Sequence, residues 1–208
     1  MVNVICMKWG TKYGPEYVNR LYAMVARNLS LPFRFVCLTD DATVLNENIQ
    51  TFAIPSLGLD LNGPERGWNK LVTFQERLYD LSGRALFLDL DLIITASIND
   101  FFELPGSVII IKDWLKRDGT GNSSVYRFTI GEHSDVLADF KADFAAVKRQ
   151  FRNEQEYLSA ALLKKNALTY WPETWCRSFK RHCMHYFPVS LLKPPSIPDG
   201  AKIIVFHG

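Results

Sequence analysis

The sequence predicts an α/β domain built on a mostly parallel β-sheet, and three observations lead to that prediction. Short apolar runs alternate with amphipathic stretches through the first half of the chain. The apolar runs are almost continuously hydrophobic, as in strands that are buried on both faces. The chain has 208 residues, 48% of them hydrophobic, which is enough for a substantial core. We therefore expect one domain over 1–208, with helices flanking the sheet.

Two predicted helices lie in the first half, and each has its own end signals. Helix 14–29 has Pro15 in its first turn, where the fixed φ of proline fits, and Glu16 complements the helix dipole. Helix 68–83 ends at Gly83, as expected for a glycine that follows a last turn. The apolar positions expected to face the core are Val18, Leu21, Tyr22, Val25 and Leu29, then Leu71, Phe74, Leu78 and Leu81. We predict strands at 3–9, 32–41 and 49–55, with a Gly- and Pro-rich loop at 56–67.

The second half is more mixed. Residues 134–151 and 153–166 are predicted amphipathic helices, capped by Ser134 and Asn153. Residues 169–200 are rich in aromatic residues and proline without clear periodicity. We expect most of their rings to be core, with a platform for an acceptor sugar as the alternative; these rings are Trp171, Trp175, Phe179, Tyr186 and Phe187. We predict strands at 85–88, 107–114, 121–131 and 201–208.

Composition and charge narrow the classes of partner. The net charge of +2 argues against a nucleic-acid partner. No apolar run approaches the length of a membrane span, and the N-terminal run lacks the basic start of a signal peptide. We therefore expect a cytoplasmic protein. Basic residues gather at 177–185, which leaves open a peripheral contact with the inner face of a membrane, although a solvated surface is the simpler interpretation.

The cysteines are expected to be reduced, because disulfides are rare in cytoplasmic proteins. Cys6 and Cys37 lie in apolar runs and are expected to pack as small core residues. A zinc site is a weak alternative for the C-terminal group, because its spacing matches no standard zinc finger. The residues of that group are Cys176, His182, Cys183 and His185.

Two aspartates follow the strand 85–88 and raise the main functional question. Asp89 and Asp91 are separated only by Leu90. Residues i and i+2 of an extended chain point to the same side, so the two carboxylates are expected to face one site. In open α/β sheets, ligands bind beyond the carboxyl ends of the strands. A shared divalent cation such as Mg²⁺ or Mn²⁺ would relieve the repulsion between the carboxylates and would also bind phosphate oxygens.

Other interpretations of this pair remain open at this point. One aspartate can cap the following turn while the other lies on the surface. A phosphatase of the haloacid dehalogenase type also has a strand that ends in Asp-x-Asp, with the first Asp as nucleophile and the second as general acid. That motif usually has Thr or Val two residues after the second Asp, where this chain has Ile93. It also lies near the N-terminus and needs a later acidic pair that we do not find in the sequence.

The segment 69–104, "NKLVTFQERLYDLSGRALFLDLDLIITASINDFFEL", resembles the central block of the family 8 glycosyltransferases, the glycogenin and bacterial galactosyltransferase type. These enzymes have the GT-A fold. They share a Lys-Leu pair at the start of a helix, a strand that ends in Asp-x-Asp, and an "ID-LF"-like segment. The matching residues here are Lys70–Leu71, Asp89–Asp91 and Ile98–Phe102.

Further matches keep the same order along the chain. Tyr13 follows the first strand, at the place of a tyrosine that stacks on the nucleotide base in the family. "GNSSV" at 121–125 resembles the family's "FNSGV", and Glu154–Gln155 resembles its Asp-Gln at a helix start. "VFHG" places His207 where the family has a histidine that binds the metal.

The resemblance implies a metal-dependent hexosyltransferase that uses a nucleotide diphosphate sugar, with UDP as the expected nucleotide. The acceptor would be a glycan, a lipid-linked sugar or another molecule, and the outcome retaining. The implied cofactor is Mn²⁺ or Mg²⁺, held by Asp89, Asp91 and His207. The implied catalytic residues are Lys70, Glu154 and Gln155. The implied donor contacts are Met7, Lys8, Trp9, Tyr13, Lys70, Asp89, Leu90, Asp91, Asn122 and Ser123, with Arg66 and Asp113 as further polar candidates.

Four departures from the family pattern put parts of this in doubt. Glu154 stands where Asp is usual, and Ser124 replaces a glycine. Gly208 directly follows His207, and the family's phosphate-binding lysine would lie further on. Either the protein continues past Gly208, or it binds phosphate more weakly than family members that have this lysine. A binder of nucleotide sugars without catalytic activity is therefore a second alternative.

Overall fold

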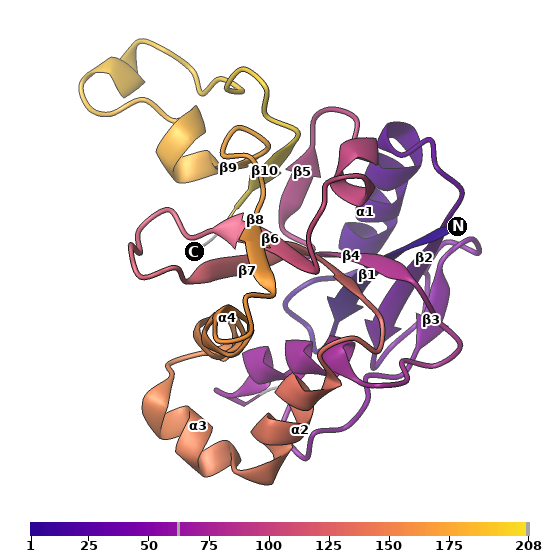
Figure 1. Ribbon diagram of the computed structural model, residues 1–208. Helices are drawn as coiled ribbons and strands as arrows, with labels where there is room; N and C mark the ends of the chain where they lie inside the picture. Colours follow the sequence, from indigo (N-terminus) through magenta and orange to yellow (C-terminus); the bar gives the residue numbers. More distant parts are fainter. Residues whose placement is uncertain (62, 207–208) are drawn as a thin grey trace.

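The computed structural model describes residues 1–61 and 63–206, and its centre is a twisted seven-stranded sheet (Figure 1). Within the described residues the strand order is β3-β2-β1-β4-β7-β6-β8. The strands are β1 Val2–Lys8, β2 Phe33–Thr39, β3 Gln50–Phe52, β4 Arg84–Leu88, β6 Val108–Lys112, β7 Gly121–Thr129 and β8 Leu168–Tyr170. All pairs are parallel except those that β7 makes with β4 and β6. The predicted fold class, a mostly parallel sheet in an α/β protein, is confirmed.

Side chains that alternate along the strands divide the core into two clusters, one on each face of the sheet. On one face, Val4 and Cys6 of β1 belong to the cluster that includes Val18 and Leu21 of helix α1 (Pro15–Asn28). On the other face, Ile5 and Met7 belong to the second cluster. That cluster includes residues of the 3-10 segment η1 (Arg66–Phe74) and of the helices α2 (Ser134–Ala142) and α4 (Glu154–Leu163).

A smaller sheet of three strands packs beside the first cluster. It consists of β5 (Leu92–Ile94), β10 (Ile203–Val205) and β9 (Cys176–Ser178), with β10 in the middle. β10 pairs antiparallel with β5 and parallel with β9. Ile203 and Val205 contribute to the same cluster as α1, so the last described strand closes one side of the core. The strand predicted at 201–208 is present over 203–205, and residues 207–208 lie outside the described part.

The helix predicted over 68–83 is wrong in its second half. The helical segment η1 ends at Phe74, and Gln75 has an extended backbone with ψ 147°. Tyr79 has a left-handed φ of 56°, its hydroxyl donates to the carbonyl of Ala53, and its ring stacks on Phe52 at 4.2 Å. The predicted apolar face is nevertheless buried, because Leu71, Phe74, Leu78 and Leu81 all lie in the second cluster. Tertiary contacts thus replace helical hydrogen bonds in this segment.

The helix predicted over 134–151 is two helices, α2 and α3 (Phe144–Gln150). Asp143 separates them, with a φ of −151°, and its carboxylate accepts from the backbone NH of Ala146 at 2.8 Å. The predicted cap at Ser134 is also wrong, because His133 precedes the first turn in a left-handed conformation and makes no side-chain cap bond. The cap predicted at Asn153 is confirmed, since its side chain accepts from Glu156 N at 3.1 Å.

The aromatic stretch 169–200 divides between core and surface. Trp171 is buried, and its ring lies 4.6 Å from that of Phe101. Tyr186 and Phe187 are exposed, so the expectation that most of these rings form core is wrong for this pair. Two short helical turns, η3 (Phe179–Cys183) and η4 (Val189–Leu191), lie in the same stretch.

The sequence predictions about the cysteines, a zinc site and membrane spans can be compared with the structure. All four cysteines are free thiols and buried. Among residues 1–61 and 63–206, no group of three His, Cys, Asp or Glu side chains is arranged to hold a metal, which includes the C-terminal Cys/His group. No helix in the described part of the chain has the length and apolarity to cross a membrane.

Candidate functional site

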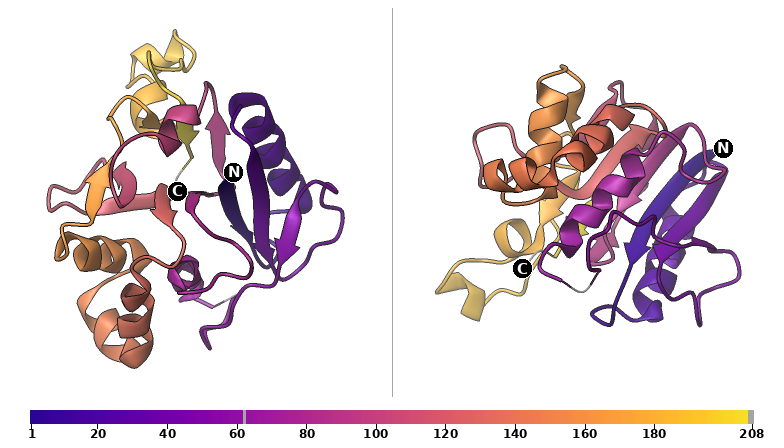
Figure 2. Two further views of the ribbon diagram at one scale, coloured as in Figure 1. Left: turned by 45° about the vertical axis from the view of Figure 1, so that its right-hand side comes forward. Right: turned by 90° about the horizontal axis from the view of Figure 1, so that it is seen from below.

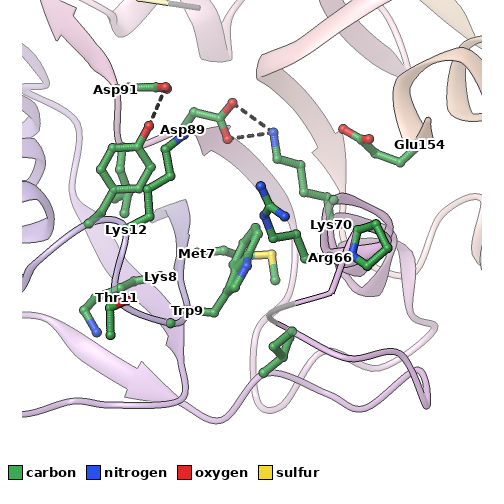
Figure 3. Close-up of a pocket in the computed structure, with 16 residues that line it drawn as sticks. Met7, Lys8, Trp9, Thr11, Lys12, Arg66, Lys70, Asp89, Asp91 and Glu154 are labelled. Carbon is green, nitrogen blue, oxygen red and sulfur yellow. Dashed lines mark hydrogen bonds and ion pairs between the residues drawn. The ribbon is translucent and has the colours of Figure 1, made fainter. Parts of the chain in front are cut away.

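A polar cavity of about 650 Å³ lies where β1 and β4 end, at the carboxyl edge of the main sheet. Parallel strands deliver their following loops to one edge, so residues 8–13 and 89–91 meet there. Leu61, Pro64, Arg66, Gly67 and Lys70, together with Glu154 of α4, complete the wall. Figure 3 shows these groups around the opening. Its lining residues are Met7–Tyr13, Leu61, Pro64, Arg66, Gly67, Lys70, Asp89–Asp91 and Glu154.

Lys70 and Asp89 form a closely packed ion pair inside this cavity. The ammonium of Lys70 lies 2.8 Å from one carboxylate oxygen of Asp89 and 2.7 Å from the other (Figure 3). Lys70 belongs to η1, and its ammonium lies 5.4 Å from the centroid of the Phe87 ring on β4. Little of either side chain is exposed, so the pair is screened only weakly by solvent.

Burial and the neighbouring charged groups set the pKa values of this pair. Burial raises the pKa of the Asp89 carboxyl above its ordinary value, although Lys70 acts in the opposite direction. Burial alone would lower the pKa of Lys70, but the surrounding carboxylates, Asp89 first and then Glu154, outweigh it and raise that pKa. The cavity as a whole is lined by both signs of charge, with three carboxylates and four basic side chains.

Asp91 faces a different partner from Asp89. One of its carboxylate oxygens accepts from the hydroxyl of Tyr13 at 2.8 Å. Its backbone carbonyl accepts from Phe206 N at 3.0 Å, directly after β10. Burial first, and Asp91 second, raise the pKa of Tyr13, so its hydroxyl stays protonated and donates. Asp91 thus links the loop after β1 to the end of the three-stranded sheet.

The geometry of the Asp-x-Asp segment agrees with the expectation that both carboxylates face one site. Asp89 and Asp91 line the cavity, while Leu90 between them is buried. Asp89 N donates to Ser124 O at 2.9 Å, which fixes the segment to β7. The two carboxylates nonetheless engage separate groups, Lys70 on one side and Tyr13 on the other.

Glu154 brings the start of α4 to the same cavity. It is 9% exposed, and its carboxylate accepts from the hydroxyl of Ser123 at 2.9 Å. In Figure 3 Glu154 lies on the far side of Lys70 from Asp89. The ammonium of Lys70 also reaches the Ser123 hydroxyl at 3.5 Å. These contacts make one polar network of β4, η1, β7 and α4.

The remaining predicted residues are placed less directly. The Gln155 side chain accepts from Ser123 N at 3.4 Å, and the Asn122 side chain accepts from Ser124 N at 3.0 Å. Neither is among the lining residues of the cavity, although both lie next to Ser123 on the network. Lys8 is buried, with its ammonium 3.4 Å from Asp41 O. Asp113 accepts from the backbone NH groups of residues 115 and 116 and does not line the cavity.

Lys12 is a site residue that the sequence analysis missed. Its ammonium lies 4.7 Å from the centroid of the Tyr13 ring, and it lines the same cavity as Asp91. The sequence feature that could have identified Lys12 is its position next to Tyr13, which was expected to stack on a nucleotide base. Arg66 was considered as a basic side chain near the donor, and the structure places it at the cavity wall.

The donor set suits a hard divalent cation but is incomplete in the described part of the chain. Two carboxylates, Asp89 and Asp91, face the cavity, and carboxylate oxygens are the ligands that Mg²⁺ and Mn²⁺ prefer. Within residues 1–61 and 63–206 no third His, Cys, Asp or Glu joins them in one group. His207, the ligand expected from the resemblance, lies outside the described residues. Because Lys70 contacts both oxygens of Asp89, a cation would share that carboxylate with it.

Comparison with known proteins addresses the fold. No family model matches the chain, and no curated protein matches it in sequence. The solved structure of the galactosyltransferase LgtC in complex with donor and acceptor sugar analogues matches 100% of this chain and 87% of that one, with a TM-score of 0.66. An active-site mutant of LgtC matches 100% of this chain and 88% of that one, with a TM-score of 0.68. Identity is 12% in both cases, so the likeness is one of architecture, and the chain has the GT-A fold that LgtC has.

Proposed function

We propose that this protein is a metal-dependent glycosyltransferase of the family 8 type that transfers a hexose from a UDP-sugar. One observation carries the proposal: two carboxylates at the end of β4 share a cavity with the buried cation Lys70, on a GT-A fold. The cavity is lined by three carboxylates, which suit a divalent cation, and by four basic side chains, which suit the diphosphate that would accompany it. A cavity of about 650 Å³ is within the usual range for small-molecule sites.

Asp89 and Asp91, with His207 as a further ligand, would hold Mn²⁺ or Mg²⁺. The cation would supply Lewis-acid stabilisation of the diphosphate leaving group. Lys70 adds a second positive charge where negative charge develops, and its contact with Asp89 fixes its position. The hydroxyl of Tyr13 donates to Asp91, which places its ring beside the metal ligands for contact with the base.

The sugar would lie toward Glu154, because this carboxylate lines the cavity on the far side of Lys70 from Asp89 and is held there by the hydroxyl of Ser123. Glu154 would then accept hydrogen bonds from sugar hydroxyls and help to orient the anomeric carbon, while Gln155 supports Ser123 behind it. In a retaining reaction, this carboxylate would serve as a nucleophile or only as an acceptor for a sugar hydroxyl. The acceptor would be a glycan or lipid-linked sugar in a cytoplasmic setting, at the inner face of a membrane.

The likeness of the fold to LgtC supports this function over the phosphatase alternative. The other alternative, a protein that binds nucleotide sugars without catalytic activity, would bind the same ligands. Binding and turnover therefore have to be measured separately.

The first test follows thermal unfolding with UDP, GDP, CDP and ADP, each with Mn²⁺ and with chelator. A ligand present at 100 times its Kd stabilises the folded state by about 2.7 kcal/mol, which raises the midpoint by roughly 5–10 °C for a chain of this size. We expect a rise with UDP that needs Mn²⁺ and is lost in Asp91→Asn. Asp139→Asn, at an exposed position on α2, is the matched control and keeps the rise.

Release of UDP from UDP-galactose and UDP-glucose then separates a catalyst from a binder. Release that depends on Mn²⁺ and falls in Lys70→Met supports transfer chemistry, because the lysine stabilises the leaving group. Absence of a midpoint shift with every nucleotide would refute the donor site. A shift without release, with acceptor sugars present, would leave the binder as the function.

A further inference from the structure

A second feature, outside the donor cavity, is an unusual surface segment at residues 179–198. Of the fourteen large apolar or aromatic side chains that are exposed in the described part of the chain, seven lie between Met184 and Ile197. Leu192 is 87% exposed, Phe187 80% and Tyr186 78%. Scattered exposed apolar residues are normal, but such a gathering marks an interaction site.

The same segment is basic. Residues 179–198 include Lys180, Arg181 and Lys193 and two histidines, and no Asp or Glu. Apolar and aromatic side chains interleaved with cations, without acids, are typical of surfaces that lie in the boundary layer of an anionic bilayer. The apolar groups enter the acyl region, while the cations attract the lipid phosphates.

The segment stands out from the rest of the molecule as a loop with two short turns (Figures 1 and 2, yellow). Its base is anchored, because Ser196 N donates to Cys183 O at 3.0 Å and Cys183 packs with Ala201 and Ile204 of the small sheet. The exposed rings and leucines lie beyond that anchor. They are therefore available for a flat partner while the fold below them is held.

A cavity connects this segment to the donor site. It measures about 850 Å³, lies between α1 and β5, and includes Phe179 together with Tyr13 and Asp91 of the polar cavity. Two further exposed apolar side chains, Ile93 and Phe206, line it. Asp91 is its only acid among the residues described, whereas its cations are Lys12, Arg20, Arg27 and Lys180. The basic apolar character thus continues from the segment to the edge of the site.

We infer that residues 179–198 dock this protein on the surface of an anionic phospholipid bilayer. The docking places the cavity between α1 and β5 at the bilayer, so that a membrane-borne substrate reaches Asp91 from that side. The docking itself needs no nucleotide. Its consequence for the acceptor rests on the proposed function.

A second copy of this chain fits the segment less well. A symmetric dimer places the same patch on both sides of the interface, so the cations of one copy would face those of the other. Without acids in the patch to pair them, that arrangement brings like charges together. An anionic lipid surface offers the opposite charge over the same area.

The test is co-sedimentation of the full chain with vesicles, in the absence of nucleotide and metal. Vesicles of phosphatidylcholine alone are compared with vesicles that also contain phosphatidylglycerol. We expect binding to the anionic vesicles, weakened by added salt, and about tenfold or more loss in the double variant Leu191→Glu/Leu192→Glu. The double variant Thr43→Glu/Val44→Glu makes the same charge change at exposed sites in the loop between β2 and β3 and should bind like the wild type.

Several outcomes would overturn the inference. These are absence of binding to anionic vesicles, equal loss in both double variants, or a dimer in light scattering that only Leu191→Glu/Leu192→Glu dissociates. Thermal unfolding of each variant checks that it is folded. Nucleotide binding is measured separately from vesicle binding. Failure to bind vesicles would therefore not refute the donor site, and failure to bind nucleotides would not refute membrane docking.

Discussion

At the scale of single residues, the contribution of His133 to the stability of the fold is expected to depend on pH. It has a left-handed φ of 56°, and its Nε2 lies 2.6 Å from the hydroxyl of Ser107. Burial lowers the pKa of His133 below its ordinary value of 6.5, Lys165 acts in the same direction, and Glu132 opposes it. The folded state therefore binds fewer protons than the unfolded chain does just below that value.

A pH series on His133→Asn tests this coupling. The stability contribution of the neutral imidazole is complete above pH 6.5 and decreases as the pH falls below it, since protonation favours unfolding. Asparagine tolerates the left-handed backbone, so the variant should fold. We expect urea unfolding of the wild type to lose more stability than that of His133→Asn between about pH 6.5 and 5. Parallel profiles for the two proteins would contradict the assignment.

Single residues also show what the sequence could reveal about the site. The Asp-x-Asp pair after an apolar strand and the resemblance around Lys70 were readable, because both depend on local order. The hydrogen bond from Tyr13 to Asp91 was not, because it joins positions 78 residues apart. Its geometry depends on how two loops meet at the sheet edge, and no local pattern encodes that.

At the scale of elements, the helix starts predicted at residues 14, 134 and 153 agree with the structure to within one residue, whereas the interruptions at Gln75 and Asp143 were missed. Asn153 begins α4 as expected, whereas the segment after Phe74 departs from helix although its apolar spacing is helical. In that segment, burial of Leu78 and Leu81 is compatible with either conformation. The contacts of Tyr79 with Ala53 and Phe52 favour the non-helical one, and they come from a distant part of the chain.

The cap at Asn153 can be tested with matched substitutions. Asn153→Ala removes the acceptor for Glu156 N and should lower the free energy of unfolding by about 1 kcal/mol. Asn153→Asp keeps an acceptor and should remain close to the wild type. Since Glu154 begins the same helix, we also expect weaker nucleotide-sugar binding in Asn153→Ala. Chemical denaturation is the measurement, and an equal loss in both variants would argue against capping.

At the scale of the whole molecule, the small sheet is a second structural unit that the sequence indicated only in part. The final strand was predicted from its apolar run, but its partners, β5 and β9, were not. Each of these is three residues long, which is too short for periodicity to mark. The parallel part of the main sheet, in contrast, follows from long buried runs separated by helical signals.

A pair of isoleucine substitutions compares the core with the protruding segment. Ile203 is fully buried in β10, while Ile197 is 61% exposed. Ile203→Ala should cost about 2–5 kcal/mol, because it removes buried apolar contacts and leaves a cavity. Ile197→Ala should change stability by no more than about 0.5 kcal/mol. Urea unfolding measures both, and a large effect at Ile197 would show that the segment packs on the fold.

The position of β10 has a consequence for the order of folding. The backbone NH of Phe206 donates to the carbonyl of Asp91, and β10 pairs with β5. The backbone position of Asp91 and of the strand that follows it therefore depends on residues 203–206. Contacts of such long sequence separation form late, because the intervening chain must first be ordered. During synthesis the main sheet up to β8 can assemble while β5 still lacks its neighbour. Asp91, a proposed metal ligand, therefore gains the hydrogen bond to its backbone carbonyl only once β10 is in place.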